Sequence, residues 1–339
     1  MPLVKDTSIV IVGQVNQDTV NLTTSIRQFL PASELIISTW ESCYKTKLKE
    51  LLLADKVIYN KDPGAEIFDF KAKKENNVNR IIVSSQNGIK ASSGQNILRI
   101  RSDMILLNAR FLTLFDYLSY RDERCSLFKE RVIAYPIFSI KRECRQNKYL
   151  RTLFHVSDWC YYGLKEDLTE LFNIKLVKEP EFSQYFKIQT KSQNDIYPER
   201  FWRMSPEQYI TSENAKKIFP SLKFDSYLDI TREGLLCSDK FIFNNFLFFS
   251  PFEWGIEIAK EQYRYIDMKY EYDGADYYNK TSVLNDQIKL FSLAESTQSY
   301  PPRSRFQVIM YKIKKAYKIG GVLRVFIAAV RLFQSKIQS

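Results

Sequence analysis

The strongest constraint on the fold is a repeated alternation, near the start of the chain, of short apolar β-branched segments with segments of helical spacing. Residues 8–12 (SIVIV) form an apolar run that ends at Gly13, which is typical of a buried parallel strand. This alternation, with its short connections, predicts an α/β fold: a single Rossmann-type domain with a mostly parallel central sheet and right-handed crossovers. Further strands are expected at residues 34–38, 56–60 and 97–102, and helices at residues 21–30, 44–54 and 77–90, the last ending near Asn87-Gly88.

The second half of the chain is less regular. Residues 197–209 mix aromatic with charged side chains and are expected to form a loop that leads into a short helix. Residues 240–254 are dense in phenylalanine, which indicates either a part of the core or a wall that faces a substrate.

The net charge of +11 is concentrated at the C-terminal end of the chain. Residues 296–339 contain no Asp or Glu and nine basic residues, which leaves only +2 (11 − 9) for the rest. A nucleic-acid-binding module usually carries its charge on the folded binding face, so this distribution argues against a nucleic-acid partner. The nine basic residues are Arg303, Arg305, Lys312, Lys314, Lys315, Lys318, Arg324, Arg331 and Lys336.

Pro301-Pro302 separates a body of residues 1–300 from a basic tail of residues 301–339. Between residues 306 and 334, apolar side chains recur mostly at three- and four-residue steps, which predicts amphipathic helices. One interpretation is a helix that docks on the body through its apolar face. The absence of acidic residues favours an anionic membrane surface instead, where each Lys or Arg contributes about 1 kcal/mol.

The sequence also indicates where the protein is found. Its N-terminal segment has too short an apolar run for a signal peptide, and no run reaches the roughly 18 apolar residues of a spanning helix. We therefore expect a cytoplasmic protein that lies peripherally on the inner face of the cell membrane. The five cysteines form no CxxC pair, which indicates reduced thiols: Cys43, Cys125, Cys144, Cys160 and Cys237.

Ligands of open parallel sheets bind at the carboxyl ends of the strands. No GxGxxG or GxxxxGK[ST] motif is present, so a classical dinucleotide site or P-loop is disfavoured. Asp103 follows the fourth expected strand. A carboxylate in this position can hold a divalent cation. The alternative is that Asp103 only caps the strand or begins a turn. Four groups follow expected strands: Gly13-Gln14, Ser38-Thr39-Trp40-Glu41, Asp62-Pro63-Gly64 and Arg101-Ser102-Asp103.

His155 is the only histidine, in the segment FHVSDWCYYGLKEDL. A lone histidine is more often structural than catalytic, but here Asp158 and Trp159 follow a strand-like LFHV and precede Gly163, where the chain can turn. A carboxylate is the usual base for a sugar hydroxyl, and an aromatic face packs against a sugar ring. Without a second histidine or a CxxC pair a His-rich zinc site is excluded, and without a GxSxG elbow a serine hydrolase is disfavoured.

Several short motifs together resemble the WavE-type lipopolysaccharide synthesis family. They are IVIVGQV, LPASELIISTWE, DPG, NNVNRIIVSSQNGIKAS, LRIRSDM, HVSDWCYYGLKEDL and RMSPEQY, in this order. The resemblance is good over residues 5–210 and weaker beyond them. It implies a GT-A-like glycosyltransferase that transfers a sugar from a nucleotide-sugar donor to a growing bacterial surface glycan, lipopolysaccharide or capsule.

The resemblance also implies a donor site. GT-A enzymes usually carry an Asp-x-Asp metal motif where this chain has Arg101-Ser102-Asp103, so Asp103 is the expected ligand of Mn²⁺ or Mg²⁺. Arg101 replaces the first acid, which puts metal binding in question, and it can instead hold the diphosphate or an acidic sugar directly. The expected donor-binding residues are Gly13, Gln14, Thr39, Asp62, Asn79, Arg80, Arg101, Ser102 and Asp103.

For catalysis, Asp158 is the first choice of general base and Glu207 the second, with His155 beside them. Residues 1–165 are expected to form the donor-binding half and residues 166–300 the acceptor-side half. A glycan or lipid-linked acceptor is the expected second substrate, bound by Trp159, Trp202 and Arg203.

Two other functions are compatible with the sequence. A nucleotidyltransferase that makes the activated sugar also uses an α/β sheet, but the segment after the first strand (GQVNQDTVN) lacks the glycine- and Lys/Arg-rich loop that such enzymes normally carry. A non-catalytic, membrane-associated scaffold of glycan assembly would retain the fold and tolerate replacement of Asp103 and Asp158.

Overall fold

The computed structural model describes residues 6–45, 53–118, 120–145, 148–191, 195–259 and 276–278. Its centre is a seven-stranded sheet in the order β12-β8-β11-β6-β1-β2-β3. Six of these strands run parallel, and β11 alone is antiparallel, between β6 and β8. The strands are β1 (Thr7–Val12), β2 (Glu34–Trp40), β3 (Lys56–Asn60), β6 (Asn96–Arg101), β8 (Val132–Ala134), β11 (Cys160–Leu164) and β12 (Phe246–Phe248).

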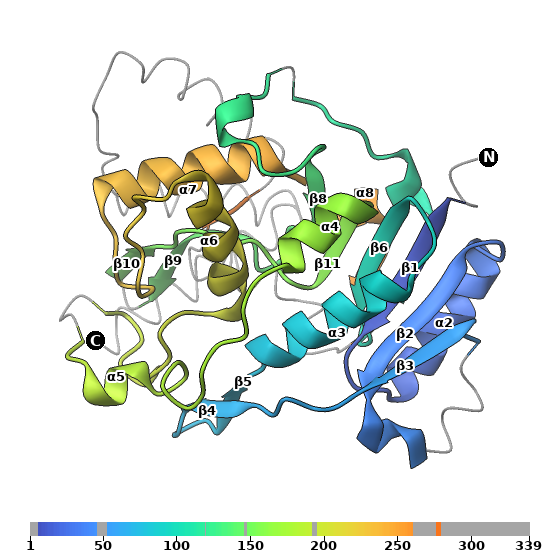
Figure 1. Cartoon of the computed structure of the whole chain (residues 1–339), viewed down its shortest axis with the longest axis horizontal. Helices are drawn as coiled ribbons and strands as arrows, with labels where there is room; N and C mark the ends of the chain where they lie inside the picture. The colour runs from blue at the N-terminus through green and yellow to red at the C-terminus, as the bar shows by residue number, and fades with distance from the viewer. Residues whose placement is uncertain are drawn as a thin grey trace, which may run out of the picture.

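Helices α3 and α4 lie across one face of this sheet, and α6 and α7 continue that layer beyond it (Figure 1). Three of the described helices begin with capping boxes, in which each of two residues bonds through its side chain to the backbone N–H of the other: Asn16 with Thr19 in α2, Ser205 with Gln208 in α6, and Ser250 with Glu253 in α8. The helices are α2 (Gln17–Phe29), α3 (Val78–Ala91), α4 (Lys165–Phe172), α5 (Tyr185–Ile188), α6 (Pro206–Ile218), α7 (Arg232–Asn245) and α8 (Pro251–Trp254).

Smaller sheets and single turns surround the central sheet. The hairpin of β9 (Ile140–Arg145) and β10 (Lys148–Arg151) pairs with β14 (Asp276–Tyr277). Strand β7 (Met104–Leu106) pairs with β13 (Ile256–Ile258), and β4 (Glu66–Asp69) pairs with β5 (Lys74–Asn76). The 3₁₀ turns are η1 (Glu41–Lys45), η3 (Arg110–Thr113) and η4 (Glu123–Cys125).

Gly88 lies inside α3, and the helix does not end there as predicted. A Cβ atom at Gly88 would lie 2.4 Å from Cγ1 of Val10 and 3.0 Å from Cβ of Ser38. The glycine therefore lets α3 pack directly against β1 and β2, and this close packing replaces the predicted helix stop.

The strands predicted at residues 8–12, 34–38, 56–60 and 97–102 are confirmed to within a residue or two. Most of the helix predicted at residues 44–54 lies outside the described residues, as does the whole basic tail. The prediction that residues 153–156 form a strand is wrong, because they lie in the loop between β10 and β11. Gly163 was also placed wrongly, since it lies within β11 and not at a turn.

In the second half of the chain, the loop predicted at residues 197–209 leads into α6, whose 13 residues make it longer than expected. The Phe-rich segment 240–254 belongs mainly to the core, where Phe241, Phe246 and Phe248 are fully buried. Its strand β12 lies in the same sheet as the strands of residues 1–165. The division into a donor half and an acceptor half stays a prediction.

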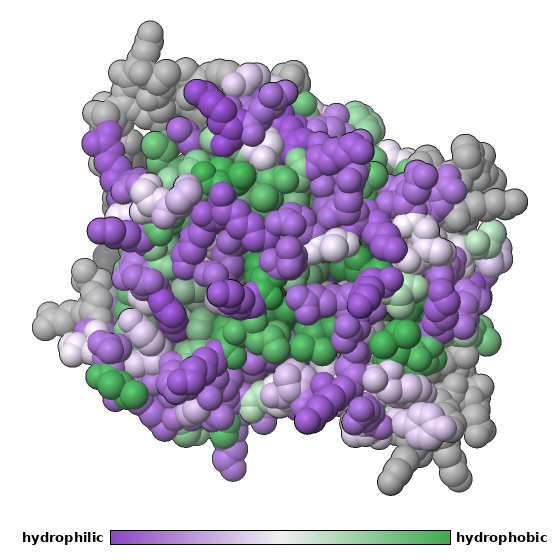
Figure 2. Space-filling view, viewed as in Figure 1, coloured by the Kyte–Doolittle hydropathy of each residue, from purple (hydrophilic) through white to green (hydrophobic). Residues whose placement is uncertain are grey.

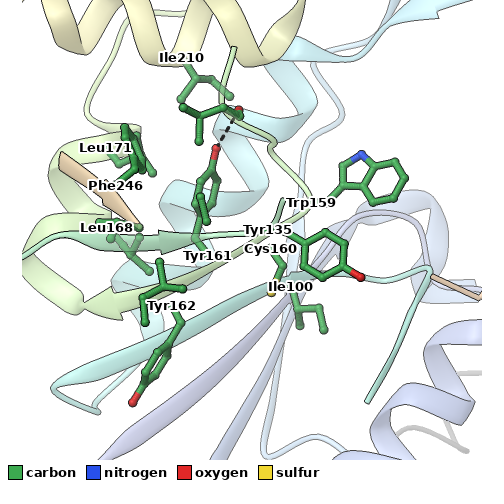
Figure 3. Close-up of a cluster of buried hydrophobic side chains, with 14 of the residues drawn as sticks. Ile100, Tyr135, Trp159, Cys160, Tyr161, Tyr162, Leu168, Leu171, Ile210 and Phe246 are labelled. Atoms are coloured by element: carbon green, nitrogen blue, oxygen red, sulfur yellow. Dashed lines mark hydrogen bonds between the residues drawn. The ribbon is translucent and has the colours of Figure 1, made fainter. Parts of the chain in front are cut away.

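Successive side chains of β11 fill both sides of the sheet. Tyr161 and Tyr162 point to opposite sides of the strand, and Tyr161 lies toward Ile210 of α6 (Figure 3).

The outer face seen in Figure 2 is mostly hydrophilic, with hydrophobic side chains gathered near its centre. Among the described residues, no helix combines the length and the apolar character that crossing a membrane requires.

Candidate active site

The end of β6 carries a buried ion pair. Arg101 donates from Nε to Oδ1 of Asp103 at 2.9 Å and from Nη2 to Oδ2 at 2.7 Å. The Asp103 side chain is 7% exposed and that of Arg101 is 32% exposed, so the arginine is the more accessible member of the pair. Two of the five N–H donors of Arg101 bind Asp103. The remaining donors are the part of this pair that can bind an anionic ligand.

Gly13 and Ser102 lie against each other beside this pair. Gly13 has a φ of +117°, which glycine adopts readily, and a Cβ atom there would lie 3.0 Å from Oγ of Ser102. The backbone N–H of Ser102 donates to the carbonyl oxygen of Val12 at 3.0 Å, which joins the ends of β1 and β6. Gln14 follows in an exposed position. Two predicted donor-binding segments, Gly13-Gln14 and Arg101-Ser102-Asp103, therefore meet at one edge of the sheet.

The arrangement of Asp103 does not fit a divalent-cation site. Both of its carboxylate oxygens accept hydrogen bonds from Arg101, so a cation would have to displace the guanidinium. In the part of the chain that the structure describes, no three His, Cys, Asp or Glu side chains are grouped in a way that could hold a metal ion. The predicted metal role of Asp103 stays a prediction, and the positive charge at this position is that of Arg101.

Asp158 lies just before β11 and is 3% exposed. Burial, and next the negative charge of Glu207, raise the pKa of Asp158 to about 6, while Arg101 and Arg99 oppose that rise. Because β11 runs antiparallel to β6, the residues that precede it return to the carboxyl end of β6. The antiparallel strand thus places a titratable carboxylate near Arg101.

Arg99 holds the loop that carries Asp158. It is 1% exposed; its Nε donates to Oγ of Ser85 at 3.0 Å, and its Nη1 donates to the backbone carbonyl of Asp158. Its guanidinium carbon lies 5.4 Å from the ring centre of Phe172 and 6.0 Å from that of Tyr161. The sequence interpretation overlooked Arg99, although an arginine inside an otherwise apolar strand is a visible signal.

Glu207, at the start of α6, is the more accessible of the two acids, with a side chain 13% exposed. Its burial raises the pKa of the carboxyl group, and the charge of Glu143 adds to that rise. Its Oε2 lies 3.9 Å from Nε2 of His155. The geometry therefore favours Glu207 over Asp158 as the carboxylate that a second substrate can reach.

Trp159 does not form the open aromatic wall that the sequence suggested. It is 5% exposed and packs beside Tyr135, with ring centres 6.3 Å apart, and Phe138, with ring centres 4.7 Å apart. The guanidinium of Arg101 lies 5.2 Å from the centre of its ring. Trp159 thus supports Arg101 from within the core, and Figure 3 shows it beside Tyr135.

Three other predicted donor residues make structural contacts. The amide of Asn79 bonds to both the N–H and the carbonyl of Val177, at 2.9 and 3.0 Å. Arg80 forms two hydrogen bonds of 2.7 Å with Asp62, which links the start of α3 to the end of β3. Strands β1 and β2 lie between β3 and β6, so this pair is roughly 14 Å along the sheet edge from Arg101.

Thr39 is fully buried in β2 and does not reach the surface. Of the predicted acceptor residues, Arg203 binds Asp225, with Nη2 2.9 Å from Oδ1. Trp202 stacks on Phe68, with ring centres 3.8 Å apart, and lines a small pocket that also contains His155. Seven residues of that pocket were not predicted: Glu143, Leu150, Thr152, Arg200, Ser205, Gln208 and Tyr227.

Solved structures show distant similarities. A cytidylyltransferase from Leptospira borgpetersenii serovar Hardjo-bovis shares 12% identity with this chain. The similar region covers 51% of this chain and 66% of that protein, with a TM-score of 0.30. The inositol-1-phosphate CTP transferase from T. maritima shares 10% identity over 70% of this chain and 96% of its own, with a TM-score of 0.30. TM-scores this low support no conclusion about this chain.

A Drosophila β-1,4-galactosyltransferase 7, solved with manganese, UDP-Gal and xylobiose, shares 12% identity over 49% of this chain and 52% of its own, with a TM-score of 0.24. No curated protein matches the chain. In contrast, one protein-family model matches residues 8–308, which is nearly the whole chain. The chain belongs to the family described as WavE lipopolysaccharide synthesis.

Proposed function

We propose that the protein is a glycosyltransferase that transfers a sugar from a nucleotide-sugar donor to a growing bacterial surface glycan. One observation carries the proposal: a partly exposed arginine at the carboxyl end of a parallel strand lies near two carboxyl groups whose pKa values are raised. Perturbed acids beside an anion-binding group are typical of catalytic sites. Membership of a lipopolysaccharide synthesis family supports the same class of substrate.

In the proposed reaction, Glu207 takes the proton of an acceptor hydroxyl as its oxygen attacks the anomeric carbon of the donor sugar. The bond from that carbon to the phosphate oxygen breaks, and its electron pair leaves with the nucleoside diphosphate. Arg101 neutralises the charge that develops on the diphosphate. The raised pKa of Glu207 suits a base that accepts a proton near neutral pH, and the charge of Glu207 in turn helps to raise the pKa of Asp158 to about 6.

The test is a panel of nucleotide sugars incubated with the full chain, with and without Mn²⁺ or Mg²⁺, followed by mass detection of products. We expect release of a nucleoside diphosphate from one or a few donors. Pyrophosphate release from a nucleoside triphosphate and a sugar phosphate would identify a nucleotidyltransferase instead. No turnover with any donor or triphosphate would favour a non-catalytic scaffold.

We also propose that the basic tail holds the protein at the anionic inner surface of the cell membrane, where a lipid-linked acceptor is found. Nine basic residues without an acidic one support this proposal, since even half of them would give reversible attachment. Truncation after Ser299 is expected to abolish co-sedimentation with anionic liposomes while donor hydrolysis stays measurable. Continued sedimentation of the truncated protein would assign membrane binding to another surface.

A further inference from the structure

A small polar pocket lies next to Glu207. It is formed by the β9–β10 hairpin, the segment before α6, and the ring of Tyr227. Its free space is about 20 Å³, enough for one water-sized group. The pocket is lined by Glu143, Leu150, Thr152, His155, Arg200, Trp202, Ser205, Gln208 and Tyr227.

Glu143 presents an acceptor to this pocket without a hydrogen bond of its own. It is 7% exposed, and its carboxylate makes no side-chain hydrogen bond within the described ranges. Nη1 of Arg200 lies 3.9 Å from Oε2 of Glu143, and the guanidinium carbon of Arg200 lies 3.4 Å from the ring centre of Tyr197. The oxygens of Glu143 are not among the fully buried side-chain atoms that lack a partner, so they reach the free space of the pocket, where a donor supplied by a ligand would stabilise the carboxylate.

Two further groups in the pocket can accept a hydrogen bond. Nδ1 of His155 lies 2.9 Å from the carbonyl oxygen of Phe138, which can only accept, so Nδ1 carries the proton and Nε2 of the neutral ring is an acceptor. Burial lowers the pKa of His155 and keeps the ring neutral. Oγ1 of Thr152, a residue 4% exposed, has no partner among the residues that the structure places.

We infer that this pocket is the acceptor-sugar subsite and that it selects a neutral, hydroxyl-bearing sugar over one that carries a carboxylate. An acceptor-rich pocket of this size takes one hydroxyl group, which donates to Glu143 or Nε2 of His155. Trp202 forms an apolar wall beside the rest of the ring. A carboxylate in the same place would lie against the charge of Glu143 and be excluded by repulsion.

The position of the pocket relative to Glu207 supports this inference, which rests on the proposed glycosyltransferase function. His155 lines the pocket, and its Nε2 is 3.9 Å from Oε2 of Glu207. Glu207 in turn interacts electrostatically with Arg101. A sugar anchored in the pocket would therefore present another of its hydroxyl groups to the proposed base, on the side that faces the donor.

The inference is tested by binding of methyl glycosides to the full chain, measured by saturation-transfer NMR and by titration. Methyl glucoside, galactoside and mannoside are compared with methyl glucuronide. We expect binding of at least one neutral glycoside and none of the glucuronide. Tighter binding of the glucuronide, or no binding of any glycoside, would overturn the inference. This assay needs no donor turnover, so failure of the catalytic proposal is detected separately.

Matched variants locate the site. Glu143→Gln is expected to weaken binding of the neutral glycoside about 10- to 100-fold, and Thr152→Val about 2- to 10-fold. The control Glu181→Gln, at an exposed side chain, should leave binding unchanged. Because the Thr152 hydroxyl has no partner among the described residues, Thr152→Val should not lower the thermal midpoint. Unchanged binding in both pocket variants would place the glycoside elsewhere.

Discussion

Replacement of Glu207 by glutamine is expected to reduce sugar transfer by roughly 100- to 10,000-fold, the range in which removal of a general base acts. Glutamine cannot act as a base, which is why the rate should fall. It has nearly the same shape as glutamate, so the fold and donor binding should persist. Single-turnover transfer with a saturating donor measures the chemical step, and calorimetry with the donor measures binding. Wild-type rates in this variant would remove Glu207 from the reaction.

The pH dependence separates Glu207 from its neighbour Asp158. A base acts in its ionised form, and the pKa of Glu207 is raised, so transfer should decline as the pH falls through that raised value. The charge of Glu143 adds to the raised pKa of Glu207, so Glu143→Gln removes a charge that raises the pKa of the base. The acidic limb of the rate profile should then move to lower pH. A loss of rate at every pH in Asp158→Asn, with Glu207→Gln active, would instead identify Asp158 as the base.

Replacement of Arg101 by methionine should reduce transfer by about 100- to 1,000-fold, because the charge that develops on the leaving diphosphate loses its stabilising partner. The same change leaves the carboxylate of Asp103 buried without its two hydrogen bonds. Loss of one partner of a buried pair costs on the order of 3 kcal/mol, so the thermal midpoint should fall as well.

The double variant Arg101→Met with Asp103→Asn distinguishes these two effects. Removal of the second charge should restore much of the stability, since the buried carboxylate that the guanidinium compensated is then also gone. Activity should stay low, because no positive charge faces the diphosphate. If the double variant regains transfer, Arg101 has only a structural role, and Asp103 was the harmful group in the single variant.

The first half of the fold was predictable because its strands are buried on both sides and therefore read as continuous apolar runs. The same rule gave a wrong prediction of a strand at residues 153–156. Phe154 and Val156 are fully buried, yet they belong to a loop, so burial there is not accompanied by strand pairing. Apolar character alone cannot distinguish the two cases in a segment of four residues.

The candidate site was predictable in its residues and not in its arrangement. Arg101 and Asp158 were chosen from local motifs, but their proximity depends on the place of β11 in the sheet order. That order is set by long-range pairing, which leaves no periodic signal in the sequence. Glu143 and Thr152 were overlooked for the same reason, since the hairpin that carries them contacts the site only through tertiary packing.

The insertion of β11 between β6 and β8 also has a consequence for synthesis of the protein on the ribosome. Strand β6 is translated about 60 residues before its partner β11, roughly 3–12 s at about 5–20 residues per second. During that interval β6 has one neighbour in β1 and an open edge of unpaired backbone groups beside Ile97, Leu98 and Ile100. Such edges pair readily with other chains. A nascent chain of this topology is therefore most vulnerable to aggregation just before residue 160 emerges, and pausing or truncation there should make it a substrate for chaperones.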